Sequence, residues 1–265
     1  MLKKIKDFFN KVSNKNLKNK KISRVLVSDA AKIKGKTTKL FIEYKDNSPS
    51  IREIKEQDIV KWIFENEERK RIIIEEIYGE ENIETVIKLE VKEPLLNKSE
   101  QKTIGDIDAV IIPIHNPEKT TVIEFKKVKL ITLKNGISKP NKISAIKRKG
   151  FSQIKKLRKF NYSKTYLGIV IEDDARNVVS ANTLLRSTKN KMIDNIFEEN
   201  FIENLESKAG LLIINLIQPT GKNFRVRYNL EIFTSKIAKE VYQDKKTTEK
   251  ILKLLEKENK WQHFV

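Results

Sequence analysis

The chain has 265 residues, with 55 lysines and arginines against 36 aspartates and glutamates, a formal net charge of +19. The absence of cysteine excludes disulfides and thiolate metal sites, and two histidines, His115 and His263, are too few for a histidine-based zinc site. No run of 18 uncharged apolar residues and no signal-peptide pattern is present, so we expect a cytoplasmic protein without a membrane span.

Residues 1–50 are predicted to form a basic N-terminal extension, and residues 51–265 the main domain with a C-terminal α/β extension. Residues 1–21 have apolar positions at helical spacing, which predicts an amphipathic helix that packs on the body, contacts a partner or touches an anionic membrane. Strands predicted at residues 22–28 and 37–44 form either a separate module or an extension of the main sheet.

The next segment is predicted to be one helix over residues 51–78, which Gly79 ends. Residues 85–91 alternate between apolar and polar side chains, so we expect the first core strand there. Glu90 on this strand either lies near the acidic residues that follow or is an edge charge that discourages aggregation. Residues 92–102 are polar and are expected to be an exposed connection.

A β-hairpin is predicted next. Its strands, residues 104–114 and 120–130, are rich in isoleucine and valine and flank a turn around Asn116. A hairpin symmetric about Asn116 places Asp108 opposite Glu124.

The same register places Asp106 opposite Lys126, so four ionisable groups share one end of an apolar strand pair. Two carboxylates about 5 Å apart across a strand pair are suited to share Mg²⁺ or Mn²⁺ through their oxygens. Lys126 is then placed to orient a water or to neutralise charge on a phosphate.

A basic helix is predicted over residues 142–160, after a turn at Asn135-Gly136. It places Lys149, Gln153 and Lys156 on one stripe.

Residues 165–171 are nearly all apolar and are expected to form a strand buried on both faces, with the acidic residues 172–174 solvated at its end. The remaining elements are expected to be a helix at 191–205, a hairpin with strands at 210–218 and 224–233 around a turn at 219–223, and a final helix at 235–257.

The basic charge is uneven along the chain. Residues 46–100 hold 15 acidic and 9 basic side chains, whereas residues 125–171 hold 14 basic and no acidic ones. This basic stretch begins at the candidate site, as a surface that holds a phosphate backbone should. The alternative is a solvated lysine-rich surface.

Three sequence features together resemble the PD-(D/E)xK nuclease superfamily: Gly105-Asp106-Ile107-Asp108, then Glu124-Phe125-Lys126, then Gln153. They are similar to its RecB-like pattern of G-x-x-D, E-x-K and a helical glutamine. The resemblance spans residues 84–173. It implies an α/β restriction-endonuclease-like core, which is a central mixed β-sheet flanked by helices, with N-terminal and C-terminal extensions.

The resemblance also implies a nuclease that hydrolyses DNA phosphodiester bonds. Asp108 and Glu124 would bind Mg²⁺ or Mn²⁺, with or without the Phe125 carbonyl, while Lys126 positions the attacking water and Gln153 lies beside the site. In the family, a glutamate on the helix before the first core strand often completes the site. The candidates here are Glu68, Glu75 and Glu76.

The basic residues expected to hold the nucleic-acid backbone are Lys127, Lys147, Lys149 and Lys156. Nucleases of this type often act as homodimers or as subunits of larger complexes, and the sequence leaves open whether this chain acts alone and whether its substrate is RNA. The alternatives are a non-catalytic nucleic-acid-binding protein, a nuclease-like subunit, or an interaction protein that recruits a partner through its N-terminus.

Overall fold

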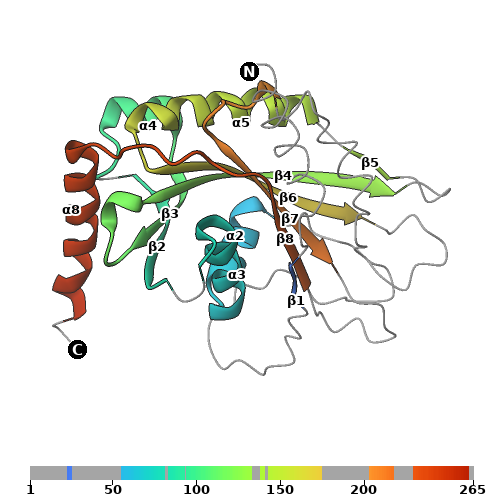
Figure 1. Ribbon diagram of the computed structural model, residues 1–265. Coiled ribbons are helices and arrows are strands. Elements are labelled where there is room, and N and C mark those ends of the chain that lie inside the picture. The colour runs from blue at the N-terminus through green and yellow to red at the C-terminus, as the bar shows by residue number, and fades with distance from the viewer. Residues whose placement is uncertain are drawn as a thin grey trace, which may run out of the picture.

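The computed structural model describes residues 23–25, 55–80, 83–92, 94–132, 138–140, 143–174, 203–217 and 229–262. These segments form a mixed β-sheet with helices on both faces, so the predicted fold class is confirmed (Figure 1). The elements expected at residues 1–21 and 37–44, the turns at Asn135-Gly136 and 219–223, and most of the helix expected at 191–205 lie outside the described residues.

The sheet has eight strands in the order β1-β8-β7-β6-β4-β3-β2, with β5 paired to β4. Strands β2, β3 and β4 pair antiparallel, whereas β6 pairs in parallel with both β4 and β7. The predicted antiparallel pairing at the C-terminal side is confirmed for β7 and β8, but β8 spans Asn229–Lys236 where the sequence predicted a strand at 224–233. The strands are β1 (Ser23–Val25), β2 (Thr85–Val91), β3 (Ile107–Pro113), β4 (Thr121–Thr132), β5 (Ser138–Pro140), β6 (Lys164–Asp174), β7 (Gly210–Ile217) and β8 (Asn229–Lys236).

Helices cover the two faces separately. Helices α2 (Glu56–Phe64) and α3 (Glu67–Tyr78) lie below the sheet in Figure 1, and α4 (Lys98–Ile104) and α5 (Ile143–Leu157) lie above it. Helix α8 (Lys245–Gln262) packs on the α4 side, where Ile251 and Leu254 meet Val110 and Tyr162. Short 3-10 helices occur at η1 (Pro117–Lys119) and η2 (Arg158–Phe160). Among the described residues, no helix is long and apolar enough to cross a membrane.

The prediction of a single helix over residues 51–78 is wrong, because the helix is interrupted at Asn66. Its side chain accepts a hydrogen bond from the backbone N–H of Arg69 at 3.0 Å and so caps α3 as a new helix. Gly79 ends α3 in the left-handed conformation, as predicted.

The exposed connection expected at residues 92–102 contains α4 instead. Asn97 and Glu100 form a reciprocal capping box at its start, and Gly105 (φ 85) ends it, so β3 begins at Ile107 rather than at residue 104. The Asn97–Glu100 capping box is a helix-start signal in the sequence, but the polar composition of residues 92–102 led to the prediction of an exposed connection.

Two C-terminal boundaries also differ. The last helix begins at Lys245 rather than at residue 235, because the chain has no regular structure over residues 237–244 and Asp244 caps α8 by accepting the Thr247 N–H at 2.7 Å. At the other end of the chain, β1 pairs with β8 at the edge of the main sheet. This short N-terminal strand therefore extends that sheet.

Candidate active site

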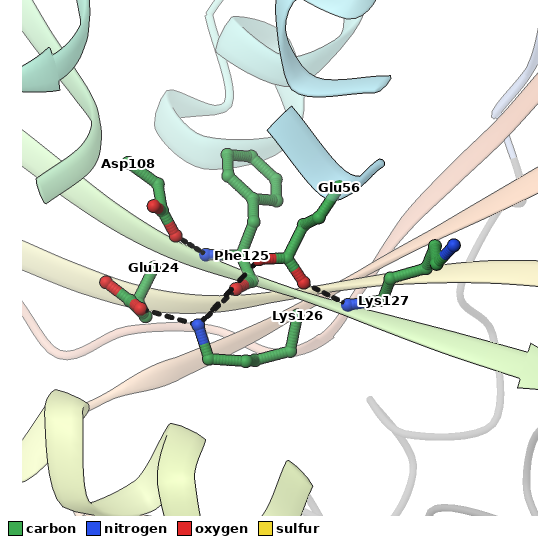
Figure 2. A network of polar contacts seen from close by, with 6 residues as sticks. All are labelled: Glu56, Asp108, Glu124, Phe125, Lys126 and Lys127. Carbon is green, nitrogen blue, oxygen red and sulfur yellow. Dashed lines mark hydrogen bonds and ion pairs between the residues drawn. The ribbon is translucent and has the colours of Figure 1, made fainter. Parts of the chain in front are cut away.

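The β3–β4 register brings the predicted carboxylates together. The pair Val110 and Val122 fixes a hairpin centred on Asn116, as the sequence predicts. Beyond the last ladder pair, the Asp108 carboxylate accepts a hydrogen bond from the Phe125 N–H at 2.7 Å (Figure 2). Asp108 and Glu124 therefore lie at the same end of neighbouring strands.

Lys126 folds back over β4. Its ammonium donates to Glu124 Oε1 and to the Phe125 carbonyl, both at 2.6 Å, and lies 3.9 Å from Glu56 Oε1 (Figure 2). The Lys126 side chain is 16% exposed and Glu124 only 1%. A partly exposed lysine thus contacts a buried carboxylate, Glu124, and lies near the half-buried Glu56.

Glu56 is a site residue that the sequence prediction missed. It lies in the first turn of α2, and its Oε2 accepts a hydrogen bond from the backbone N–H of Lys127 (Figure 2). It sits at the start of the helix that was expected to be continuous to Tyr78. The Asn66 cap marks the start of α3 only, so no cap signal in the sequence singles out Glu56.

The three candidate glutamates are exposed or make contacts elsewhere, so the structure gives no reason to assign any of them to this cluster. All three belong to α3, which packs farther along the sheet: Glu75 pairs with Arg71 at 3.2 Å, Glu76 accepts from the Thr234 N–H at 3.0 Å, and Glu68 is exposed.

Asp106 does not pair with Lys126 as expected. Its carboxylate lies 3.3 Å from the Lys92 ammonium, because the Gly105 turn redirects the chain just before β3 begins. Asp108, Glu124 and Lys126 remain together without it.

Glu90 lies near the acidic cluster, one of the two alternatives left open by the sequence. It adopts a positive φ of 53° where the β2–β3 ladder skips a pair. A small cavity of about 10 Å³ is lined by Glu90, Glu56, Asp108 and Lys61, and the Lys61 ammonium lies 3.6 Å from Glu90.

The environment favours the protonated form of the carboxyls. Burial, reinforced by the negative charge of Asp108, raises the pKa of Glu124 to about 8 although Lys126 opposes this. Burial also raises the pKa of Asp108 and that of Glu56. Burial alone would lower the pKa of Lys126, but Glu124, Glu56 and Asp108 more than offset it, so its pKa lies above the usual value.

The oxygens of the cluster fit a hard divalent cation as a mixed set of side-chain and backbone donors. Glu124 Oε2 is fully buried and receives no hydrogen bond. The Phe125 carbonyl and the Asp108 carboxylate supply the other oxygens. Within the described segments, no three carboxylate or imidazole side chains are close enough to hold a metal by themselves, so the backbone oxygen is an essential part of the set.

Helix α5 passes the cluster at Gly150. A Cβ atom there would lie 3.6 Å from Lys126 Cγ and 3.2 Å from Leu167 Cδ1. Gln153 and Lys147 lie one turn after and one turn before Gly150, on the same helix face. The predicted helical glutamine therefore belongs to the face that passes Lys126.

The predicted backbone-binding lysines are placed differently from one another. Lys149 is exposed and Lys156 is half-buried near the end of α5. Lys127 does not lie on the surface: its side chain is 11% exposed and lies 3.4 Å from Glu172, which is 2% exposed. The solvated end expected for residues 172–174 is thus wrong for Glu172, because β6 lies between β4 and β7 in the sheet.

Comparison with known proteins finds no match in sequence and weak similarity in structure. No protein-family model matches the chain, and no curated protein matches it in sequence. The solved structure of SfsA from Pyrococcus furiosus in complex with Ca²⁺ is similar over 66% of this chain and 63% of that chain, with 14% sequence identity and a TM-score of 0.27. The match spans less than two thirds of that protein, so the function is inferred from this chain's own residues.

Proposed function

We propose that the chain is a metal-dependent nuclease that hydrolyses phosphodiester bonds, with DNA as its substrate. The observation that carries this is Glu124 Oε2, which is buried without a hydrogen-bond donor beside a lysine that already bridges Glu124 and the Phe125 carbonyl. Leaving a buried polar atom unpaired costs about 1–3 kcal/mol. A cation ligand removes that cost, and the resemblance of the motif to PD-(D/E)xK nucleases gives the cation a role.

Glu124, Asp108 and the Phe125 carbonyl would hold Mg²⁺ or Mn²⁺. A bound divalent ion supplies a water of lowered pKa and polarises the scissile phosphate. Both carboxyls have raised pKa values, so they must release their protons before they serve as ligands.

Lys126 acts as a positively charged hydrogen-bond donor in this scheme. Its raised pKa keeps the ammonium protonated, so it orients the attacking water and stabilises negative charge on the phosphate rather than accepting a proton. Glu56 is a positioning residue: one carboxylate oxygen holds the Lys127 backbone N–H and the other lies near the Lys126 ammonium.

A non-catalytic nucleic-acid-binding protein is the second candidate. It is favoured because the described residues contain no cluster of three metal-binding side chains and because the Lys126 ammonium already neutralises Glu124. In that case Lys126 and Glu124 form a structural ion pair, and the basic residues of α5 account for the whole activity. In the nuclease scheme, the described part of the chain has one candidate site, so a homodimer or a larger complex would supply a second site for simultaneous cleavage of both strands.

Plasmid nicking in the presence of Mg²⁺ or Mn²⁺ tests the proposal. We expect Lys126→Ala and Asp108→Ala each to lower the nicking rate by about 100-fold or more, the usual effect of removing a group that stabilises transition-state charge. Lys155→Ala is the matched control, since Lys155 is exposed on α5. Equal rates for wild type, Lys126→Ala and Asp108→Ala would contradict the assignment. Metal-independent binding without nicking would favour the second candidate.

A further inference from the structure

A second basic cavity, of about 430 Å³, opens where the start of α4, the end of α5 with η2, and the start of α8 meet. Its wall carries four lysines, together with the ring of Phe160 and the carboxylates of Glu100 and Asp244. The lysines are Lys156, Lys159, Lys246 and Lys250.

The two carboxylates are already engaged inside the fold. Glu100 accepts the Asn97 N–H at 2.7 Å in the α4 capping box. Asp244 accepts the Thr247 N–H at 2.7 Å and the Asn161 side-chain amide at 3.1 Å. The lining therefore has four lysines against two carboxylates that also cap helices, so its net charge is positive and the cavity favours an anion.

One wall combines a fixed cation with an aromatic ring. The Lys250 ammonium donates to the Leu95 carbonyl at 2.9 Å and lies 6.0 Å from the centre of the Phe160 ring. The cavity is larger than a phosphate group needs and falls within the size range of small-ligand sites. Lysines beside an aromatic ring are the combination that holds a nucleic-acid backbone and its neighbouring base.

Helix α5 links this cavity to the candidate active site. It passes Lys126 at Gly150, and Lys156 follows six residues later, about 9 Å along the helix axis. That separation is too large for both places to contact the same phosphate and suits a nearby phosphate of one strand. The helix and η2 carry no acidic residue between the two places.

We propose that the cavity is a subsite for a second phosphate of the nucleic-acid strand, with Phe160 against the adjoining sugar or base. The inference rests on the proposed function for the class of substrate. It adds a contact point outside the predicted catalytic residues and assigns Lys159, Lys246 and Lys250 to substrate binding together with Lys156.

The test compares two double variants of equal charge change. Lys159→Glu with Lys246→Glu alters the cavity, whereas Lys155→Glu with Lys245→Glu alters exposed neighbours outside its lining. Affinity for a fluorescein-labelled DNA oligonucleotide is measured by anisotropy with EDTA present, which separates binding from cleavage. We expect the cavity variant to bind about tenfold more weakly than the control variant and to lose about two units of salt dependence.

An equal loss of DNA affinity in the two variants would overturn the proposal, because the loss would then come from general surface charge and not from the cavity. Absence of DNA binding by the wild type would overturn it as well. Thermal unfolding shows whether both variants fold, and Lys159→Gln with Lys246→Gln replaces the cavity variant if the glutamates unfold the chain.

A competing anion identifies the source of the phosphate. If inorganic phosphate or a deoxynucleoside monophosphate raises the melting temperature of the wild type but not of the cavity variant, and both variants bind the oligonucleotide equally, the cavity takes a small anion and the strand subsite is wrong. The nicking assay separates this outcome from failure of the proposed function. Full activity in Lys126→Ala with weak binding in the cavity variant would refute the nuclease site and keep the subsite.

Discussion

Lys126 holds a position that a metal ion would share. Its ammonium contacts Glu124 Oε1 and the Phe125 carbonyl at equal distances of 2.6 Å, and these oxygens belong to the set we propose for the cation. Where Glu124 is ionised and no metal is bound, the ammonium therefore compensates its buried charge. Metal binding would require Lys126 to give up part of this contact, which frees the ammonium to face the substrate.

The Glu124 carboxyl should make stability depend on pH. In the folded chain its pKa is about 8, against 4.5 for the ordinary group, so the folded state holds a proton that the unfolded state has released. Stability from this group is complete below about pH 4.5 and falls as the pH rises to about 8. With EDTA present, the melting temperature of Glu124→Gln minus that of the wild type should increase across this pH window. Above about pH 8 the difference should stay constant.

Melting curves at one-unit pH intervals check this prediction. Glu118→Gln is the control, because Glu118 is exposed at the hairpin turn. Parallel pH profiles for wild type and Glu124→Gln would show that Glu124 titrates as it does in the unfolded chain.

The sequence predicted the residues whose spacing is local and missed the one that arrives from another element. Asp108 and Glu124 follow from a short turn and the two-residue period of strands. Glu56 meets the Lys127 backbone across 71 residues of sequence, so its place depends on how α2 packs on the sheet. A charged residue in a first helical turn has no pattern that specifies such a contact.

Strand β6 controls the geometry of β4 at the site. Phe125 supplies the N–H to Asp108 and the carbonyl to Lys126, and its ring packs edge-on against Phe64 with centroids 6.2 Å apart. Gly168 on β6 makes room for this ring, since a Cβ atom there would lie 2.5 Å from Phe125 Cδ1. The ring is 0% exposed, so it has no free space into which to move.

Gly168→Ala should therefore disturb fold and site together. We expect a loss of about 1–3 kcal/mol in unfolding free energy from overpacking, and slower nicking, because Phe125 must shift. Gly150→Ala is the matched control for stability: its new Cβ would lie 3.2 Å from Leu167 Cδ1 and 3.6 Å from Lys126 Cγ, whereas the Cβ at Gly168 would lie 2.5 Å from the Phe125 ring. Urea unfolding of both variants gives the comparison, and a Gly168→Ala chain as stable as wild type would contradict the close packing.

At the level of elements, the strands were easier to predict than the helix boundaries. The buried strand expected at residues 165–171 appears as β6, because an apolar run between turns has few alternatives. The continuous helix over residues 51–78 failed because apolar periodicity persists through Asn66, and only the cap reveals the break. Cap residues carry the boundary information that periodicity lacks.

In the described part of the chain, the helices on the two faces of the sheet differ in charge. Residues 46–100, with 15 acidic and 9 basic side chains, include α2 and α3 on one face, whereas the acid-free stretch 125–171 includes α5 on the other. Figure 1 shows these helices on opposite sides of the sheet. If the chain binds nucleic acid as proposed, this difference would favour approach from the α5 side, where Lys147, Lys149 and the basic cavity lie.

Metal binding should be visible in the stability of the whole chain. A ligand that binds only the folded state at 100 times its dissociation constant adds about 2.7 kcal/mol. For a chain of this size, that corresponds to a rise of about 5 °C or more in the melting temperature. We expect Mn²⁺ to produce this rise in the wild type at about pH 8, where Glu124 is losing its proton, and a smaller one at pH 6.

Glu124→Gln and Asp108→Asn should abolish the Mn²⁺ effect, while Glu118→Gln should keep it, because Glu118 lies at the exposed turn away from the cluster. The readout requires no substrate, so it separates the two candidate functions directly. A melting temperature indifferent to Mn²⁺, combined with DNA binding that weakens steeply with salt, would favour a non-catalytic binder whose Lys126–Glu124 pair is structural. A metal-dependent rise confined to chains that retain both carboxylates would instead establish the cation site before any cleavage is measured.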